Sequence, residues 1–244
     1  MFISTEGLVL REKDIGENDR LITILTRELG VVSAFASGVK SVKSKRGSAT
    51  SLLSFSSFQL QKKKDTYRVS EAVSKHIFLE VGDDLTVLSV AQYFCELAEL
   101  LAPRESEANT VLRLLLNSLH FLTKEKRDPY LMKAITELRL AALSGYCPDL
   151  VACSSCGKFE DDIMYFNPAD GSLLCSDCKM NGGMELNRTC VSAMRHIVYS
   201  QFGRLYSFDI PENDAKLLSN VTERYVLYQT DHRFLTLDFI HSLG

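Results

Sequence analysis

The stretch that decides the fold runs from Cys153 to Cys178 and reads CSSCGKFEDDIMYFNPADGSLLCSDC. It holds two Cys-x-x-Cys pairs with eighteen residues between them. One such pair can wrap a tetrahedral cation in a tight turn, and a second pair about fifteen to twenty residues further on completes a four-cysteine zinc site. The sequence therefore predicts one structural zinc ion bound by Cys153, Cys156, Cys175 and Cys178.

The residues between the two pairs favour a short β-hairpin. Residues 163–166 are apolar, residues 168–171 include Pro, Asp and Gly, and residues 173–174 are apolar again. All four candidate ligands are sulfur, and no nearby His or carboxylate marks an open coordination position, so the metal is predicted to stabilise structure and not to activate water. Two disulfides, or four unrelated buried thiols, are the alternative interpretation of the same residues.

The overall composition is that of an ordinary soluble globular protein, with 45% hydrophobic and 24% charged residues among 244. The first residues are not a basic stretch followed by an apolar run, and no segment reaches about eighteen consecutive apolar residues, so we expect neither secretion nor a membrane span. Seven cysteines is an odd number, and Cys95, Cys147 and Cys190 are scattered. Free thiols favour a reducing compartment, so a cytoplasmic location is expected.

The net charge of −3 hides an asymmetry along the chain. Residues 1–80 carry thirteen Lys and Arg against nine Asp and Glu, whereas residues 81–244 carry fifteen against twenty-two. Such a change of sign suggests that the first part meets a polyanion while the second does something else.

The N-terminal part has the pattern of a small β-barrel. Short strands are predicted at residues 7–11, 21–26, 31–37, 58–61 and 67–69, with turn signals between them. In the third strand, one face holds Val32, Ala34 and Ala36. Five short strands in so short a segment indicate a closed or partly open barrel, of which the oligonucleotide-binding (OB) fold is one example. The strand count alone does not single out that fold.

Basic residues gather in two connections of this barrel. The first cluster lies between Gly38 and Ser51, and the second lies at and after residue 62. The candidate DNA-binding residues are Lys40, Lys43, Lys45, Arg46, Lys62, Lys63, Lys64 and Arg68. Flexible cationic loops can follow phosphates and release counterions. A charged loop is often merely solvated, but two clusters on one small barrel favour nucleic acid.

Four aromatic residues of the barrel have two possible roles. Phe35, Phe55, Phe58 and Tyr67 can supply faces on which bases stack, or they can form the barrel core. The core is the more common role of such residues.

The hydrophobic period changes near residues 81–84 from two to about 3.6, which predicts an α-helical domain. Three helices with apolar stripes are expected at residues 85–102, 112–122 and 129–142, and the third begins at Asp128 and Pro129. After the cysteines we expect a helix ending near Gly203, another capped by Asn213, and a last one at residues 234–243. The predicted organisation is α+β, with an OB-type barrel at 1–80 and a helical domain at 81–244 that carries a zinc-binding insertion at 146–186.

No motif in the sequence argues for catalysis. The five histidines lack metal-ligand spacing, and the sequence holds no phosphate-binding Gly-rich loop, nucleophile elbow or His-Glu-x-x-His motif. Two pairs of adjacent carboxylates, residues 83–84 and 161–162, suit a two-metal nuclease poorly and are expected to be solvated turn residues. The protein is therefore predicted to bind and not to be an enzyme.

Several stretches together resemble the bacterial RecO family of recombinational repair proteins. They are residues 6–11 (EGLVLR), residues 16–26 (GENDRLITILT), Gly30, the basic region from Gly38 to Lys45, residues 137–150 leading to the first cysteine pair, and residues 166–171 (FNPADG) before the second. The resemblance runs from about residue 3 to the last helix.

The resemblance implies a protein that binds single- and double-stranded DNA, anneals complementary strands, and helps RecR to load RecA onto DNA coated by single-strand binding protein (SSB). It places that work at the nucleoid. Carried over to this sequence, Arg20 joins the phosphate contacts. The helical part is expected to meet the acidic SSB tail, through basic residues such as Arg127, Lys133 or Arg139. Two alternatives remain: a zinc-ribbon adaptor that binds only proteins, and an unrecognised hydrolase.

Overall fold

A computed structural model describes residues 2–41, 44, 46–64, 66–78, 84–179 and 181–243. The chain forms two compact units, which are described separately below. Unit 1 comprises Met1–Lys126 with Phe234–Gly244, and unit 2 comprises Arg127–Arg233. The helices after residue 80, which are predicted to form one domain, are thus shared between the two units. Residues 79–83, where that boundary is expected, lie outside the described residues.

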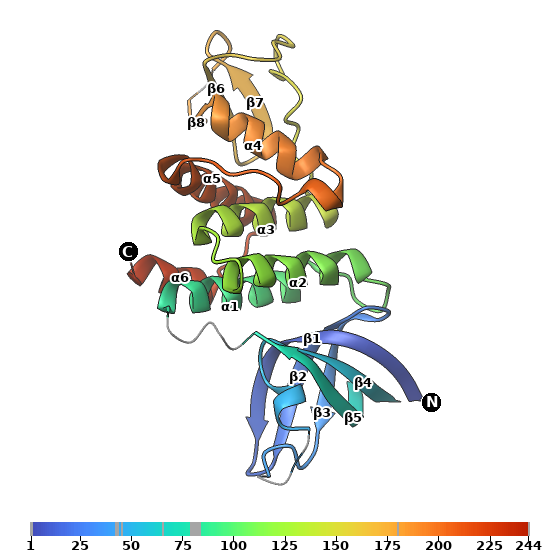
Figure 1. The fold of residues 1–244 in the computed structure, drawn as a ribbon. Coiled ribbons are helices and arrows are strands. Elements are labelled where there is room, and N and C mark those ends of the chain that lie inside the picture. Colours follow the sequence, from blue (N-terminus) through green and yellow to red (C-terminus); the bar gives the residue numbers. More distant parts are fainter. Residues whose placement is uncertain are drawn as a thin grey trace. The chain divides into compact units, whose positions relative to one another are not determined.

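Unit 1 begins with a closed barrel of five strands (Figure 1). The strands are β1 (Phe2–Ile15), β2 (Asp19–Thr26), β3 (Gly30–Ala36), β4 (Ser54–Lys63) and β5 (Thr66–Ile77), and the short helix η1 (Ser48–Thr50) precedes β4. Their order around the barrel is β1-β2-β3-β5-β4. All neighbouring pairs are antiparallel except β3 and β5, which are parallel. This confirms the predicted OB-type barrel.

The barrel core consists of residues that alternate along the strands. Val32, Ala34 and Ala36 of β3 all point into it, as predicted from their spacing. Phe58 is 2% exposed and belongs to the core, so the stacking role considered for it is wrong. Tyr67 also packs against the core. Phe35, Phe55 and Tyr67 are each partly buried, so for these three the stacking role stays a prediction.

Three helices complete unit 1: α1 (Leu85–Leu101), α2 (Asn109–Thr123) and α6 (Leu235–Leu243). Asp84 begins α1, because its carboxylate accepts hydrogen bonds from the backbone N–H groups of Thr86 and Val87. It caps the helix while it remains exposed to solvent, and Asp83, its partner in the predicted pair, lies outside the described residues. The carboxylate of Glu96 in α1 accepts from the N–H groups of Leu235 and Thr236, which fastens the start of α6 to α1.

The turn between β2 and β3 packs against the connection between α1 and α2. Val31 donates a backbone hydrogen bond to Pro103, and Ala108 donates one to Arg27, both at 2.9 Å. Gly30 has φ +64°, and a Cβ atom there would lie 2.0 Å from the Pro103 carbonyl oxygen. Only glycine fits this position, because it combines a left-handed conformation with a close backbone approach.

Unit 2 contains α3 (Pro129–Leu143), α4 (Arg188–Tyr199) and α5 (Glu212–Thr230), with the short helix η3 (Phe202–Arg204) and a three-stranded sheet. The sheet order is β7-β6-β8, formed by β6 (Ile163–Asn167), β7 (Ser172–Cys175) and β8 (Met184–Asn187). The predicted hairpin is thus present, and β8 was not foreseen. Two predicted helix ends are wrong: α4 ends at Tyr199, and Pro211, not Asn213, precedes α5.

The three basic residues suggested for an SSB-tail groove are engaged inside unit 2. Lys133 is 2% exposed, and its ammonium group lies 2.9 Å from a Glu137 oxygen and 2.8 Å from a Glu223 oxygen. Arg127 donates to backbone carbonyls of the segment that follows η3. Arg139 donates to the carbonyls of Ile197 and Val198 at the end of α4. Lys133 is therefore not available to a surface peptide, and it joins α3 to α5.

Candidate metal centre and nucleic-acid interface

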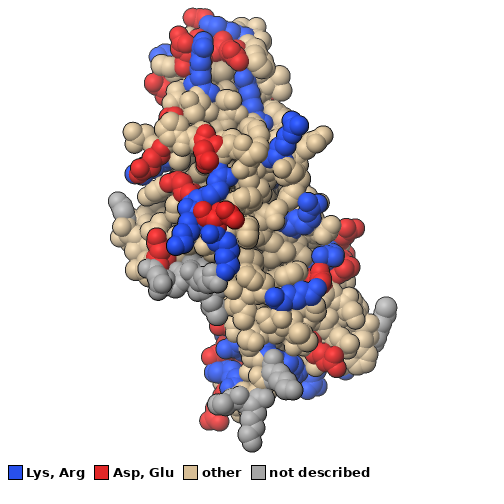
Figure 2. Space-filling model, in the orientation of Figure 1, with Lys and Arg blue, Asp and Glu red and all other residues tan. Residues whose placement is uncertain are grey.

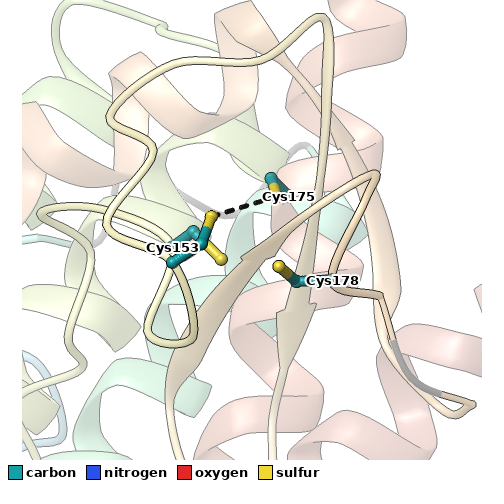
Figure 3. Close-up of side chains that lie close together, drawn as sticks. Cys153, Cys175 and Cys178 are labelled. Atoms are coloured by element: carbon teal, nitrogen blue, oxygen red, sulfur yellow. Dashed lines mark hydrogen bonds between the residues drawn. The ribbon is translucent and has the colours of Figure 1, made fainter.

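The four predicted cysteines come together in unit 2, at the end of the small sheet where β7 ends. Their Sγ atoms all lie within 4.8 Å of one another, and those of Cys156 and Cys175 are 3.7 Å apart. Sulfurs bound to a tetrahedral Zn²⁺ at about 2.3 Å lie roughly 3.8 Å from one another. Figure 3 shows the sulfurs of Cys153, Cys175 and Cys178 turned toward a common point. The cluster can hold a metal ion.

Each cysteine pair is closed by backbone hydrogen bonds. In the first, Gly157 donates to the Cys153 carbonyl at 2.8 Å, and it does so with φ +77°. In the second, which starts where β7 ends, Cys178 donates to the Cys175 carbonyl at 3.1 Å. The sequence indicated the need for a glycine after the first pair, since the chain must turn around the sulfurs there.

The electrostatics of the cluster fit a cation. Burial raises the pKa of Cys153, but backbone N–H groups of Cys156, Cys175 and Ser155 outweigh it and lower the pKa to about 6. The Ser155 hydroxyl lowers the pKa of Cys178, whereas the neighbouring sulfurs and burial together raise it to about 12. The thiolate form of Cys153 is thus stabilised, whereas the neighbouring sulfurs disfavour ionisation of Cys178. A bound divalent cation would remove that opposition and allow all four to ionise.

Asp161 is not a solvated turn residue, contrary to the sequence analysis. Its side chain is only 15% exposed, and it accepts hydrogen bonds from the backbone N–H and hydroxyl of Ser176, at 3.0 and 2.7 Å. It also pairs with Lys158 at 3.1 Å. These donors hold the pKa of the Asp161 carboxyl well below its usual range, with the Ser176 hydroxyl as the largest cause. By contrast, Asp162 is 89% exposed and pairs with Arg188.

Arg195 of α4 attaches the first cysteine pair to the helix. Its guanidinium group donates to the carbonyls of Leu150, Val151 and Phe159, at 2.7, 3.0 and 2.6 Å, and lies over the Phe159 ring. On the other side, Gln229 of α5 donates to two carbonyls of the turn between β6 and β7. No local motif announces these contacts, because the partners are backbone atoms far away in sequence.

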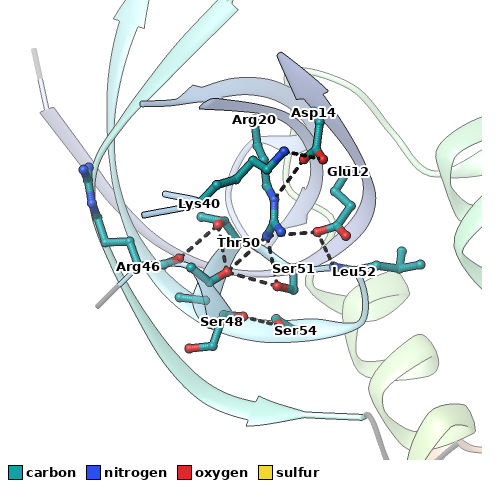
Figure 4. A network of polar contacts seen from close by, with 12 residues as sticks. Glu12, Asp14, Arg20, Lys40, Arg46, Ser48, Thr50, Ser51, Leu52 and Ser54 are labelled. Atoms are coloured by element: carbon teal, nitrogen blue, oxygen red, sulfur yellow. Dashed lines mark hydrogen bonds and ion pairs between the residues drawn. The ribbon is translucent and has the colours of Figure 1, made fainter. Parts of the chain in front are cut away.

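Arg20, a predicted phosphate contact, is largely engaged within the barrel (Figure 4). Its guanidinium group pairs with Glu12 at 3.2 Å and Asp14 at 3.4 Å, and it donates to the Gly47 carbonyl and the Ser51 hydroxyl. The side chain is 17% exposed. Arg20 therefore ties the connection between β3 and β4 to the first hairpin.

Lys40 stands at the same end of the barrel. Its ammonium group lies 2.7 Å from an Asp14 oxygen, and its backbone N–H donates to the carbonyl of Asn18. The hydrogen bond from Lys40 is the largest cause of a lowered pKa for Asp14, to which Arg20 adds. Lys40 is exposed as a residue, so this ion pair is screened by water.

Arg46 has a structural role. Its guanidinium group donates to the carbonyls of Ser37, Val69 and Ser70, at 2.9, 3.4 and 3.3 Å. It thus joins the connection after β3 to β5. Lys43 and Lys45, the other two members of this predicted cluster, lie outside the described residues.

Lys62, Lys63 and Lys64 occupy the hairpin that joins β4 to β5, and all three are exposed. Within the part of the chain that the structure describes, none of their ammonium groups forms an ion pair. Arg68 is also exposed, and it lies opposite Phe35 across the β3–β5 pair. Since Ala34 and Ala36 point inward, Phe35 points outward beside Arg68.

The surface of unit 2 shows a different charge pattern. At the top of Figure 2, Lys and Arg side chains alternate with Asp and Glu on the visible face. Among the described residues, the four cysteines are the one group of three or more His, Cys, Asp or Glu placed to share a metal. The helices of the described residues are all too short or too polar to cross a membrane.

The fold and the cluster define a class: a protein with an OB-type barrel, followed by helices that carry a cluster of four cysteines able to hold a metal ion. Two family models match the chain, "Recombination protein O N terminal" over residues 1–78 and "Recombination protein O C terminal" over residues 82–238. The chain belongs to the RecO family of DNA repair proteins.

Its similarity to individual relatives extends over nearly the whole length. The chain is 33% identical over 244 residues to the DNA repair protein RecO of Acetivibrio thermocellus, covering 99% of this chain and 97% of that protein. It is 28% identical over 233 residues to the RecO of Alkaliphilus metalliredigens, covering 95% of each. It is 29% identical over 239 residues to a RecO of Dehalococcoides mccartyi, covering 96% of this chain and 94% of that protein.

Proposed function

We propose that this protein binds single- and double-stranded DNA without sequence specificity and anneals complementary strands. One observation carries the proposal: three exposed lysines occupy the hairpin between β4 and β5 of an OB-type barrel. In OB folds, the loops between strands 1 and 2 and between strands 4 and 5 flank the face that binds oligonucleotides. A run of exposed ammonium groups there supplies phosphate neutralisation that does not depend on base identity.

Annealing requires that two strands approach while their base edges stay accessible. Lysines on a hairpin suit this task, because a flexible ammonium group neutralises charge without fixing a base. In the proposal, Lys62, Lys63, Lys64 and Arg68 make the main phosphate contacts. Phe35, which points outward beside Arg68, offers a face for stacking.

The remaining predicted DNA-binding residues divide into phosphate contacts and residues with a structural role. Lys40, Lys43 and Lys45 are kept as phosphate contacts on the connection between β3 and β4. Arg20 and Arg46 are assigned to shaping that connection, because their donors are already satisfied by carboxylates, carbonyls and a hydroxyl of the barrel.

The metal that we propose for the cluster is a single structural Zn²⁺. Four sulfur ligands in two Cys-x-x-Cys pairs are the donor set of closed zinc sites, which leave no position for a substrate. The contacts of Arg195 and Gln229 support a structural role, since they attach the metal-binding segment to α4 and α5. The metal would therefore order unit 2 and affect DNA binding only indirectly.

We further propose that the protein acts without catalysis, at the nucleoid in the cytoplasm, together with RecR and the tail of SSB, in helping to load RecA. Membership of the RecO family supports this assignment. Of the three residues suggested for the SSB tail, Lys133 is withdrawn because it is buried.

Fluorescence anisotropy with labelled single-stranded DNA at several salt concentrations tests the DNA-binding proposal. In the variant Lys63→Glu with Lys64→Glu, affinity is expected to fall roughly tenfold, and the slope of log affinity against log salt is expected to lose roughly one unit per phosphate contact. Lys124→Glu with Lys126→Glu carries the same change of charge on exposed residues after α2 and is the control.

Four outcomes of this titration separate the candidate functions. A selective loss in the hairpin variant supports the proposal. Equal behaviour of both variants and the parent would contradict the assigned interface. No salt-dependent binding by the parent would favour a protein-binding adaptor, and metal-dependent cleavage of the oligonucleotide would favour a hydrolase.

A further inference from the structure

A side chain outside the predicted set of metal ligands joins the two cysteine pairs. The first pair lies in the loop after α3, and the second starts where β7 ends, so the chain brings them together from separate segments. A direct backbone tie exists, in which Ser154 donates to the Leu173 carbonyl at 2.8 Å. This bond places the first pair beside β7, but it does not reach the residues inside the second pair.

Asp161 makes that second connection. One of its oxygens, Oδ2, accepts from both the N–H and the hydroxyl of Ser176, which lies inside the second pair. The same oxygen lies 3.1 Å from the ammonium group of Lys158, two residues after the first pair. Lys158 in turn reaches Asp177 of the second pair at 3.4 Å. A single carboxylate thus joins a residue just after the first pair to a residue inside the second.

We propose that Asp161 is the positioning residue that holds the two cysteine pairs at coordinating distance, and that it thereby sets the affinity of the cluster for its metal. A site whose ligands are already in place loses less conformational freedom when the ion binds, so it binds the ion more tightly. Groups outside the ligand set that orient the ligands typically contribute 10–100-fold in metal affinity. The inference rests on the metal site proposed above.

The adjacent carboxylate supplies a matched control. Asp162 carries the same charge one residue further on, yet it is 89% exposed and its ion-pair partner is Arg188 of α4, 3.1 Å away. If charge near the cluster were all that mattered, removing either carboxylate would have a similar effect. If positioning matters, only the loss of Asp161 will weaken the site.

The test is a Co²⁺ titration of the full-length metal-free protein, followed by thiolate-to-cobalt absorption, and then Zn²⁺ competition against a chromophoric chelator. We expect Asp161→Ala to weaken metal affinity roughly 10-fold or more, with Asp162→Ala equal to the parent. Ser176→Ala, which removes the hydroxyl donor and keeps the N–H, is expected to give a smaller loss in the same direction. It also serves if Asp161→Ala fails to fold by circular dichroism.

The outcomes are distinguishable from failure of the metal site itself. A parent that binds no Co²⁺ with a thiolate signature would overturn both the metal site and this inference. A parent that binds normally, with Asp161→Ala and Ser176→Ala unchanged, would overturn the inference alone. Equal weakening by Asp161→Ala and Asp162→Ala would also overturn it, because that result would reflect charge and not position.

Discussion

The cysteine cluster of unit 2 and the basic loops of the barrel were both predicted from residue type and spacing. They differ in whether the structure places all the predicted side chains in similar surroundings. All four cysteines meet within 4.8 Å. Among the basic residues, Arg20 and Arg46 are hydrogen-bonded to strand and loop groups of the barrel. Lys62, Lys63 and Lys64 are exposed. Metal ligation requires short, directed bonds, which only a few residue spacings allow. Cationic side chains, by contrast, are compatible with many different surroundings.

The largest expected effect concerns the cluster. Cys175→Ser removes a predicted zinc ligand that is fully buried, so metal content is expected to fall and the unfolding midpoint of unit 2 to drop by roughly 10 °C or more. Plasma emission spectrometry and thermal unfolding followed by circular dichroism measure the two quantities. Cys147→Ser changes an exposed free cysteine six residues before Cys153 in the sequence and should leave both unchanged. Equal metal content in both variants would show that the cluster does not bind metal.

The next effect divides the barrel cations into two kinds. Arg46→Ala removes three hydrogen bonds to carbonyls and is expected to cost about 1–3 kcal/mol in the free energy of unfolding. Lys64→Ala is expected to change stability by less than about 0.5 kcal/mol and to weaken DNA binding, because the side chain is exposed. Urea unfolding and DNA titration of both variants provide the comparison. If Arg46→Ala leaves stability unchanged, its assigned role is wrong.

The smallest effect concerns the carboxylate beside Lys40. Asp14→Asn removes the ion pair to Lys40 and leaves that ammonium group available to a phosphate, so DNA affinity is expected to rise roughly two- to threefold. The pKa of Asp14 is lowered, so the carboxyl is ionised at neutral pH and the gain should not depend on pH there. Glu17→Gln, an equal loss of charge in the nearby turn, is the control in the same anisotropy assay. A lower affinity for Asp14→Asn would mean that the carboxylate orients Lys40 for binding.

The two regions also show which residues a sequence pattern overlooks. Asp161, Glu96 and Arg195 each fix a segment by binding backbone or hydroxyl groups that are distant in sequence. Backbone atoms are the same at every residue, so no side-chain pattern announces that a given carbonyl or N–H will be the partner. The same reason explains the error over Asp161, because nothing in the sequence distinguishes it from its exposed neighbour Asp162.

The sequence by itself determined the barrel, the helical periodicity and the membership of the four-cysteine cluster, because alternation, helical period and ligand spacing are local properties of a chain. Only the tertiary structure decided that Phe58 fills the core, that Lys133 is buried between two carboxylates, and that Arg46 supports the barrel while the Lys62–Lys64 hairpin stays open. A cation is equally compatible with water, a carboxylate or a carbonyl. Its role is therefore set by the partners that folding brings to it.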